Sequence, residues 1–292
     1  MAVSRARLVA AFAAIYIFWG GTFLAIRYAV ADVPPLLMMA MRCSGGAVIL
    51  FAWLAVRGQL EKATRAQWGV AALAGALLFL GCHGVMAWAE QSVSSGRAAL
   101  LMISIPLSLV LLSAARERRL PSGRVLLGIG LGVAGIAVLT WGNQGGSAPL
   151  GVQLIAVLSG VSWAAGSLVG RYGARTQSAV QSTAMQLACG ALLLLATSLV
   201  FGEPHGWSPG QVSARGWLSL AFLIVCGTVL AFAAYTWLLR VSTPAVVGTY
   251  SFVNPLIALG LAWAVGDEAP NVRALFAAVL VLGAVLLSRE RT

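Results

Sequence analysis

The sequence predicts an all-α membrane protein with ten transmembrane helices, built as two inverted five-helix repeats. Three observations support this prediction. Of the 292 residues, 60% are hydrophobic and only 9% are charged, and the mean hydropathy is +0.91, whereas about a quarter of the residues in soluble domains are charged. Apolar runs of ~20 residues, the length that crosses a bilayer, follow one another along the chain. The second half of the chain also repeats residues of the first half.

The apolar runs occupy nearly the whole chain and leave little for a soluble domain. The first run follows a basic N-terminus, and its length favours a membrane span over the shorter apolar core of a signal peptide. In order, the runs predict spans at residues 8–30, 35–56, 67–89, 96–115, 122–141, 150–170, 179–201, 214–238, 244–265 and 270–288.

The basic residues of the connecting segments lie mostly on one side of this arrangement. If the termini and every second loop share a side, the opposite side holds only Arg27, Arg97, Arg215 and Arg273. The positive-inside rule then predicts cytoplasmic termini and an even number of spans. The net charge of +11 is therefore a topology signal. Because no basic stripe or soluble module accompanies it, we expect no nucleic-acid partner.

An internal repeat defines the expected architecture. A shift of 144 residues places Trp19 on Trp163, and a shift of 149 places Pro106 on Pro255. Because each repeat holds five spans, an odd number, the second must cross the membrane in the opposite sense. Secondary transporters use inverted repeats to expose one midplane site alternately to the two sides. A chance match between apolar segments is the alternative explanation. The two predicted repeats are residues 1–145 and 146–292.

A histidine near the middle of the third span indicates a central cavity. His83 shares a helical face with Phe79 and Met86, and the repeat-related face carries Phe232 and Tyr235. Polar residues inside a span usually face a cavity or a partner. We therefore expect these faces to form two walls of one cavity. A core histidine bonded to a neighbouring carbonyl is the alternative.

Two tryptophans inside the first and sixth spans are further cavity or gate candidates. Trp19 is followed by Gly20 and Gly21, and Trp163 lies close to Gly166. Small residues let helices approach closely or bend, and an indole ring offers its face to a cation or an aromatic group. A place in an aromatic belt at the membrane surface is the alternative for these tryptophans.

Two prolines inside predicted spans indicate kinks. Pro106 and Pro255 each free a backbone carbonyl of their helix. Tyr250 and Asn254, just before Pro255, could hydrogen-bond a substrate, although bending alone explains the prolines. The candidate cavity residues are Trp19, Phe79, His83, Met86, Trp163, Phe232, Tyr235, Tyr250 and Asn254, and the candidate hinge or gate residues are Gly20, Gly21, Pro106, Gly166 and Pro255.

A charged side chain inside the second span needs a partner. Arg42 lies about two turns from the end of this span, and an unpaired charge costs ~2.5–3.5 kcal/mol near the bilayer centre. Glu90 lies at a similar depth and is a candidate ion-pair partner. Structural pairing or snorkelling of the long side chain is the favoured explanation.

Two paired segments connect the chain to a known family. AEQSVSSGRAALLMISIPL and LLRVSTPAVVGTYSFVNPL, each followed by an acidic loop and a span that starts after proline, resemble the EamA repeat of the drug/metabolite transporter superfamily. FWGGTFLAIRYA in the first span is similar as well. The resemblance covers nearly the whole chain. It implies a ten-helix carrier of the bacterial inner membrane, often an exporter, with YddG-like amino-acid exporters as the nearest functional model. The family's Gly-Glu after the fourth span is replaced here by Arg116-Glu117.

The motifs that the chain lacks narrow its mechanism. It contains no P-loop, no HExxH and no paired membrane aspartates, and no acidic residue lies at the centre of a span, so gradient-driven transport is favoured over proton antiport through His83. No repeated filter indicates a channel, and no metal or cofactor is expected. We expect a monomer or weak dimer in the lipid bilayer that exports small metabolites, above all aromatic or other neutral amino acids. Sugars, nucleotide precursors and drugs are the alternative substrates.

Overall fold

The computed structural model describes residues 4–92, 98, 101–102, 104–118, 120–140, 149–265 and six single residues between 276 and 287. Within these residues every regular element is helical. The elements are α1 (Arg5–Val30), α2 (Pro35–Val56), α3 (Arg65–Gly75), η1 (Ala76–Gly84), α4 (Val85–Ala89), α6 (Ser104–Glu117), α7 (Gly123–Thr140), α8 (Leu150–Tyr172), α9 (Ala179–Val200), η2 (Pro209–Gln211), α10 (Ala214–Phe222), η3 (Leu223–Leu230), α11 (Ala231–Val241), α12 (Pro244–Val247) and α13 (Tyr250–Ala264).

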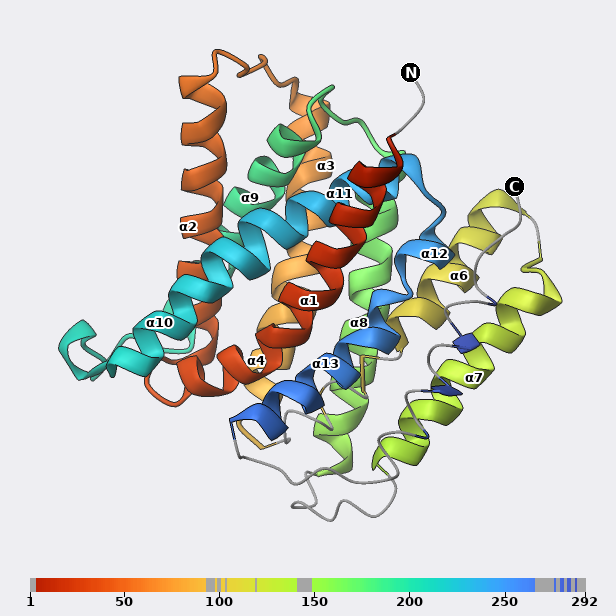
Figure 1. Cartoon of the computed structure of the whole chain (residues 1–292). Helices are drawn as coiled ribbons and strands as arrows, with labels where there is room; N and C mark the ends of the chain where they lie inside the picture. Colours follow the sequence, from red (N-terminus) through yellow and green to blue (C-terminus); the bar gives the residue numbers. More distant parts are fainter. Residues whose placement is uncertain are drawn as a thin grey trace.

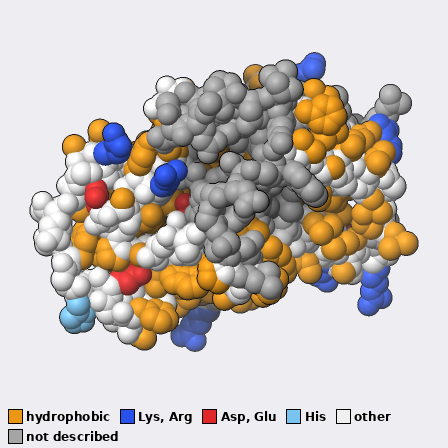
Figure 2. Space-filling view, turned by 90° about the horizontal axis from the view of Figure 1, so that it is seen from below, with side chains coloured by type: hydrophobic (Ala, Val, Ile, Leu, Met, Phe, Trp, Pro, Cys, Tyr) orange, Lys and Arg blue, Asp and Glu red, His pale blue; other side chains and the backbone are white. Residues whose placement is uncertain are grey.

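Six helical segments in the described part of the chain are long and apolar enough to cross a membrane. Their outward side chains are hydrophobic, for example Val9 and Ile17, which are 62% and 56% exposed, as expected of helices that face lipid. Figure 2 shows hydrophobic side chains over much of the periphery at one end of the molecule. A shorter apolar helix covers Gly123–Gly135, and the predicted span at 270–288 lies almost entirely outside the described residues. The six segments are Arg5–Val30, Pro35–Val56, Arg65–Ala89, Leu154–Tyr172, Ala179–Val200 and Ala214–Val241.

The third and eighth predicted spans each contain a π-helix, which the sequence did not reveal. η1 continues α3 into α4, and η3 continues α10 into α11, without a break in either segment. Thr228 lies in η3, and its side-chain Oγ1 donates to the carbonyl of Leu223 at 2.8 Å, five residues earlier. π-Helical segments are rare and are frequent at functional sites.

The two predicted interior prolines differ in their places. Pro255 lies inside α13, which follows the short helix α12 after a turn at Gly248 and Thr249. Pro106 lies in the first turn of α6, which begins at Ser104. The missing N–H of a proline costs little in a first turn because that group has no partner within the helix.

Two carboxylates connect the halves of the chain at opposite ends of the bundle. Glu203, after α9, accepts from the amides of Leu36 and Leu37 at 3.2 and 2.8 Å, at the start of α2. Glu61, after α2, accepts from the amide of Gln177, just before α9. We name the two ends of the bundle the Glu61 end, drawn at the top of Figure 1, and the Glu203 end.

Helices from the two halves of the chain pack against each other throughout the bundle. α2 packs along α9, on the left of Figure 1, while α1 packs on α13 and α8 packs on α6. Likewise, the segment from α3 to α4 packs on α8, and the segment from α10 to α11 packs on α1. Each half therefore places its first helix against later helices of the other half, and the core forms where they meet.

Candidate functional site

An apolar cavity with several polar groups extends from Trp19 and Trp163 toward the Glu203 end, where Ile26, Met39 and Glu90 line it. It comprises about 640 Å³ of space, including its mouth and the open space in front of it. Its walls come from α1, α2, η1, α4, α8 and α13, with Met102 and Ile105 from the α6 region. The lining residues of this main cavity are Trp19, Thr22, Phe23, Ile26, Met39, Arg42, Cys82, His83, Met86, Glu90, Met102, Ile105, Trp163, Tyr250, Ser251, Asn254 and Pro255.

Four lining residues present buried polar atoms that make no hydrogen bond of normal geometry with another described residue, although Ser251 and Trp163 lie close to the hydroxyl of Tyr250. They are His83 Nδ1, Glu90 Oε2, Tyr250 OH and Ser251 Oγ. Buried polar groups are nearly always hydrogen-bonded in native proteins, so a cluster of unpartnered ones needs an explanation. A polar solute or ordered water in the main cavity supplies one.

Arg42 does not pair with Glu90, contrary to the ion pair considered above. Its Nε donates to Thr228 Oγ1 at 2.8 Å and its Nη2 to the carbonyl of Gly227 at 3.4 Å. The π-helix η3 carries both acceptors, and it meets a guanidinium that is only 3% exposed. Among the described contacts, none joins Arg42 to Glu90, and the two charged groups reach the main cavity separately.

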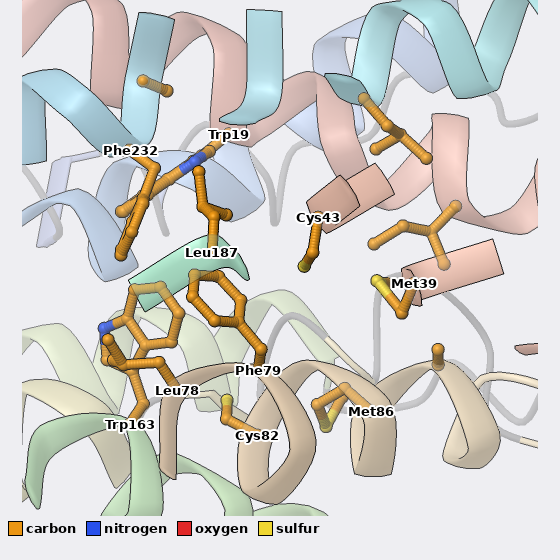
Figure 3. Close-up of a cluster of buried hydrophobic side chains, with 14 of the residues drawn as sticks. Trp19, Met39, Cys43, Leu78, Phe79, Cys82, Met86, Trp163, Leu187 and Phe232 are labelled. Carbon is orange, nitrogen blue, oxygen red and sulfur yellow. The ribbon is translucent and has the colours of Figure 1, made fainter. Parts of the chain in front are cut away.

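A layer of aromatic side chains closes the floor of the main cavity. Trp19 and Trp163 meet edge to face with centroids 5.6 Å apart. His83 stacks on Trp163 at 4.8 Å, and Phe79 meets Phe232 at 5.0 Å. Figure 3 shows Phe79, Trp163 and Phe232 projecting toward one another from different elements. We call Trp19, Phe79, Trp163, Phe232 and Tyr235 the aromatic layer.

Hydrogen bonds fix this layer to its surroundings. Trp163 Nε1 donates to Tyr235 OH at 3.1 Å, and the hydroxyls of Ser167 and Tyr235 lie 2.6 Å apart. Trp19 Nε1 donates to the carbonyl of Gly227 at 2.8 Å. Because both indole donors are occupied by protein acceptors, the layer is held in place rather than left free to bind a solute.

A second, smaller cavity lies on the other side of the aromatic layer. It comprises about 280 Å³, and its walls include Phe232, Tyr235 and Leu239. At the Glu61 end Arg171 donates to the carbonyls of Leu239 and Ser242, and Arg240 donates to those of Gln177 and Ser178. Hydrogen bonds from these two arginines therefore connect the described helices on this side of the aromatic layer.

The structure brings six of the nine predicted cavity residues together on the main cavity and places the others in or beyond its floor. Phe232 and Tyr235 line the smaller cavity, and Phe79 is buried within the aromatic layer. With its amide oriented to satisfy both ends, Asn254 donates to the carbonyls of Tyr250 and Tyr16, so it also connects α13 to α1. The six residues on the main cavity are Trp19, His83, Met86, Trp163, Tyr250 and Asn254.

The predicted hinge glycines lie inside unbroken helices and mark close helix contacts. A Cβ atom on Gly20 would lie 2.6 Å from Ile257 Cβ, and one on Gly166 would lie 2.8 Å from Leu78 Cγ. A Cβ atom on Gly21 would lie 3.1 Å from the ring of Phe222. Glycine is needed at the first two of these positions because neighbouring side chains occupy the space of a methyl group.

Sequence reasoning missed several residues of the main cavity. Thr22 lies about one helical turn after the predicted Trp19, and Ser251 directly follows the predicted Tyr250. Both are polar residues within apolar runs, and this was the signal that could have identified them. Met39 and Met102 carried no such signal, because methionine is common in any membrane span. The described residues include no group of three His, Cys, Asp or Glu side chains arranged to hold a metal ion.

Comparison with known proteins gives a consistent result. The model of the EamA-like transporter family matches residues 7–141 and again residues 150–289. The uncharacterized inner membrane transporter YedA of Escherichia coli K12 is 33% identical over 288 residues, which cover 96% of this chain and 90% of YedA. The uncharacterized transporter YoaV of Bacillus subtilis is 21% identical, with 94% of each chain covered.

A protein of known crystal structure shares the fold. It superposes with a TM-score of 0.80 at 24% identity, covering 98% of this chain and 99% of that one. The relatives named above are transporters and not enzymes, in agreement with the prediction from the sequence. With two matches of the family model across nearly its whole length, the chain belongs to the EamA-like transporter family.

Proposed function

We propose that the protein is a secondary carrier that exports small neutral amino acids by alternating access around the main cavity. One observation carries this proposal above the others: four buried polar atoms that make no hydrogen bond of normal geometry within the described chain line a single, mostly apolar cavity. An apolar wall with a few polar groups suits a solute that has a polar head and an apolar side chain. A sugar, in contrast, would need hydrogen-bond partners around its whole ring.

We also propose that the chain forms ten spans in two inverted repeats, at residues 1–145 and 146–292. The exchanged packing supports this, because α1 meets α13 as α8 meets α6. The π-helices η1 and η3 lie at repeat-related places, and so do the carboxylates of Glu61 and Glu203. Pro106, Pro255, Gly20, Gly21 and Gly166 are then the positions at which helices shift during transport.

In the proposed orientation both termini lie in the cytoplasm, as the distribution of arginines favours. The Glu203 end then faces outward, and the main cavity opens to that side while the aromatic layer closes the cytoplasmic side. The name of YedA supports an inner-membrane location. The carrier acts as a monomer or weak dimer in the lipid bilayer, without a nucleic-acid partner, and moves its substrate down a gradient.

Counterflow in proteoliposomes tests the carrier function. Vesicles that contain the purified protein are loaded with an unlabelled neutral amino acid, and uptake of the same labelled amino acid is measured with and without an imposed pH gradient. We expect saturable uptake that Trp163→Phe lowers at least tenfold, because the indole stacks on His83 and donates to Tyr235. Trp217→Phe is the matched control, since Trp217 is 39% exposed on α10, away from the cavity.

The outcomes separate the proposal from its alternatives. No saturable uptake of any amino acid by correctly folded protein would remove the amino-acid proposal. Uptake of sugars, nucleotide precursors or drugs in the same vesicles would then identify the substrate class. Equal loss in Trp163→Phe and Trp217→Phe would show that the main cavity is not the transport site.

A further inference from the structure

The main cavity carries one basic and one acidic side chain that form no salt bridge with each other in the described part of the chain. Arg42 enters from α2, and Glu90 follows α4 on another wall. The described residues form no direct contact between these two groups. Arg42 and Glu90 attract each other across the cavity, but no salt bridge joins them within the described chain, and burying charged groups without a direct partner is costly.

The guanidinium of Arg42 is oriented but not saturated. Nε and one N–H of Nη2 are used by Thr228 and Gly227, and Nη1 reaches only the sulfur of Met39, at 3.9 Å. Thr228 itself is fixed, because it donates to Leu223. A guanidinium has five N–H donors, so donors remain on both terminal nitrogens, in the fork that binds carboxylates.

The carboxylate of Glu90 is likewise available. Its Oε2 is buried and has no hydrogen-bond partner in the described chain. A buried carboxylate oxygen accepts charge-assisted hydrogen bonds, and an ammonium group supplies three donors. The walls around the two charged groups are apolar and include Ile26, Met86 and Ile105.

We propose that Arg42 and Glu90 bind the two charged ends of a zwitterionic amino acid, with its carboxylate on Arg42 and its ammonium on Glu90. An amine would leave Arg42 without a counter-charge, and a carboxylic acid would leave Glu90 without one. Only a solute with both groups compensates both buried charges, so the pair selects zwitterions over amines, acids and sugars. This inference rests on the proposed carrier function and names the groups that recognise its substrate.

Three probes with one carbon skeleton test the inference: leucine, isopentylamine, which lacks the carboxylate, and 4-methylpentanoate, which lacks the ammonium group. Each is measured by the half-inhibitory concentration with which it competes with labelled leucine in proteoliposomes. In the unmodified protein we expect leucine to compete at least tenfold better than the amine or the acid.

Two variants separate recognition from folding. In Glu90→Gln, the half-inhibitory concentration of leucine should rise at least tenfold, while that of 4-methylpentanoate should stay unchanged or fall. In Arg42→Gln, the half-inhibitory concentration of leucine should rise by a similar factor, while that of isopentylamine should stay unchanged or fall. Thr228→Val removes the Nε acceptor of Arg42 together with the hydrogen bond from Thr228 to Leu223, keeps the charge of Arg42, and should weaken the binding of leucine and of the acid more than that of the amine. Glu117→Gln is the control, because Glu117 bonds Tyr172 at the opposite end of the bundle and should leave all three values unchanged.

This crossed pattern is not expected from a loss of structure, which would weaken all three probes together. Saturable leucine transport with unchanged probe selectivity in Glu90→Gln and Arg42→Gln would overturn the inference and leave the carrier function standing. Saturable transport of sugars but not amino acids would also overturn it. If no solute is transported by the folded protein, the proposed function fails together with the inference.

Discussion

The segment from η1 to α4 and the segment from η3 to α11 share a backbone design but present different side chains. On the first, His83 Nδ1 and Glu90 Oε2 lack partners and line the main cavity. On the second, Tyr235 OH bonds both Trp163 and Ser167, and Phe232 packs against Phe79. The first wall therefore presents free polar groups, and the second wall is internally satisfied.

This difference shows how two similar segments can form one asymmetric site. Each π-helix packs against a glycine of a central helix: Thr228 lies on Gly46 of α2, and Phe79 lies on Gly190 of α9. The backbones are supported in the same way, so the unequal behaviour of the walls comes from a few side chains. The predictions below separate the shared support from the unequal chemistry.

The largest effect is expected where the two walls are supported alike. A Cβ atom on Gly46 would lie 2.6 Å from Thr228 Cγ2, and one on Gly190 would lie 2.5 Å from Phe79 Cδ2. Gly46→Ala and Gly190→Ala should each lower the unfolding free energy in detergent by about 3 kcal/mol, the upper part of the range for overpacking. Gly69→Ala, which meets no atom within 4 Å, should raise it by ~0.5–1 kcal/mol because alanine favours the helix.

Similar losses at both positions would support equal backing of the two walls. If only one of the two variants is destabilised, the helix contact at the other glycine can accommodate a methyl group. The two segments would then share their backbone structure but not the tightness of their packing.

The next prediction compares the stability effects of two tyrosine substitutions, Tyr235→Phe and Tyr250→Phe. Tyr235→Phe removes a hydroxyl that bonds Trp163 and Ser167 and should lower the unfolding free energy by ~1–3 kcal/mol, since a buried donor loses its acceptor. Tyr250→Phe removes a hydroxyl that makes no hydrogen bond of normal geometry within the described chain and should lower the unfolding free energy by less than Tyr235→Phe does.

Transport should follow the opposite order near half-saturating substrate. Tyr250→Phe should weaken apparent substrate affinity, because the hydroxyl lines the main cavity, while Tyr235→Phe should mainly alter the maximal rate. Thermal unfolding and the concentration dependence of uptake measure both quantities on the same preparations. A stability loss in Tyr250→Phe as large as that in Tyr235→Phe would contradict the division between a free wall and a satisfied wall.

The sequence predicted the membrane fold class, and six of its candidate residues lie on the main cavity, for physical reasons that operate locally. Apolar runs identify spans whatever their tertiary contacts, and a rare polar residue such as His83 identifies an inward face because lipid excludes it. The repeat then related Trp19 to Trp163, and the structure places both on the main cavity.

Features that depend on contacts between distant segments could not be predicted in this way. The partner of Arg42 is Thr228, 186 residues away, which reaches it from a π-helix that local propensity does not reveal. Glu90 was a reasonable partner by depth alone, but depth does not fix the direction of a side chain. Phe79 and Tyr235 shared the predicted faces, yet the aromatic layer holds them at or below the cavity floor.

The smallest effect compares the carboxylates that connect the halves of the chain at the two ends. Glu203 accepts from two amides at the start of α2 and from Ser198 Oγ at 2.8 Å, whereas Glu61 accepts from the one amide of Gln177 at 3.2 Å. A negative charge at a helix N-terminus contributes about 0.3–1 kcal/mol. Glu203→Gln should therefore lower the free energy of unfolding by close to the upper value, and Glu61→Gln by close to the lower one. Both decreases should be smaller at high salt, because salt screens exposed charges. Thermal unfolding of the two variants at low and high salt measures this order. A larger loss in Glu61→Gln than in Glu203→Gln would contradict this order. It would mean that the contact between Glu61 and Gln177 contributes more to stability than the contacts of Glu203 do. The Glu61 end would then be held together by this contact as well as by the aromatic layer.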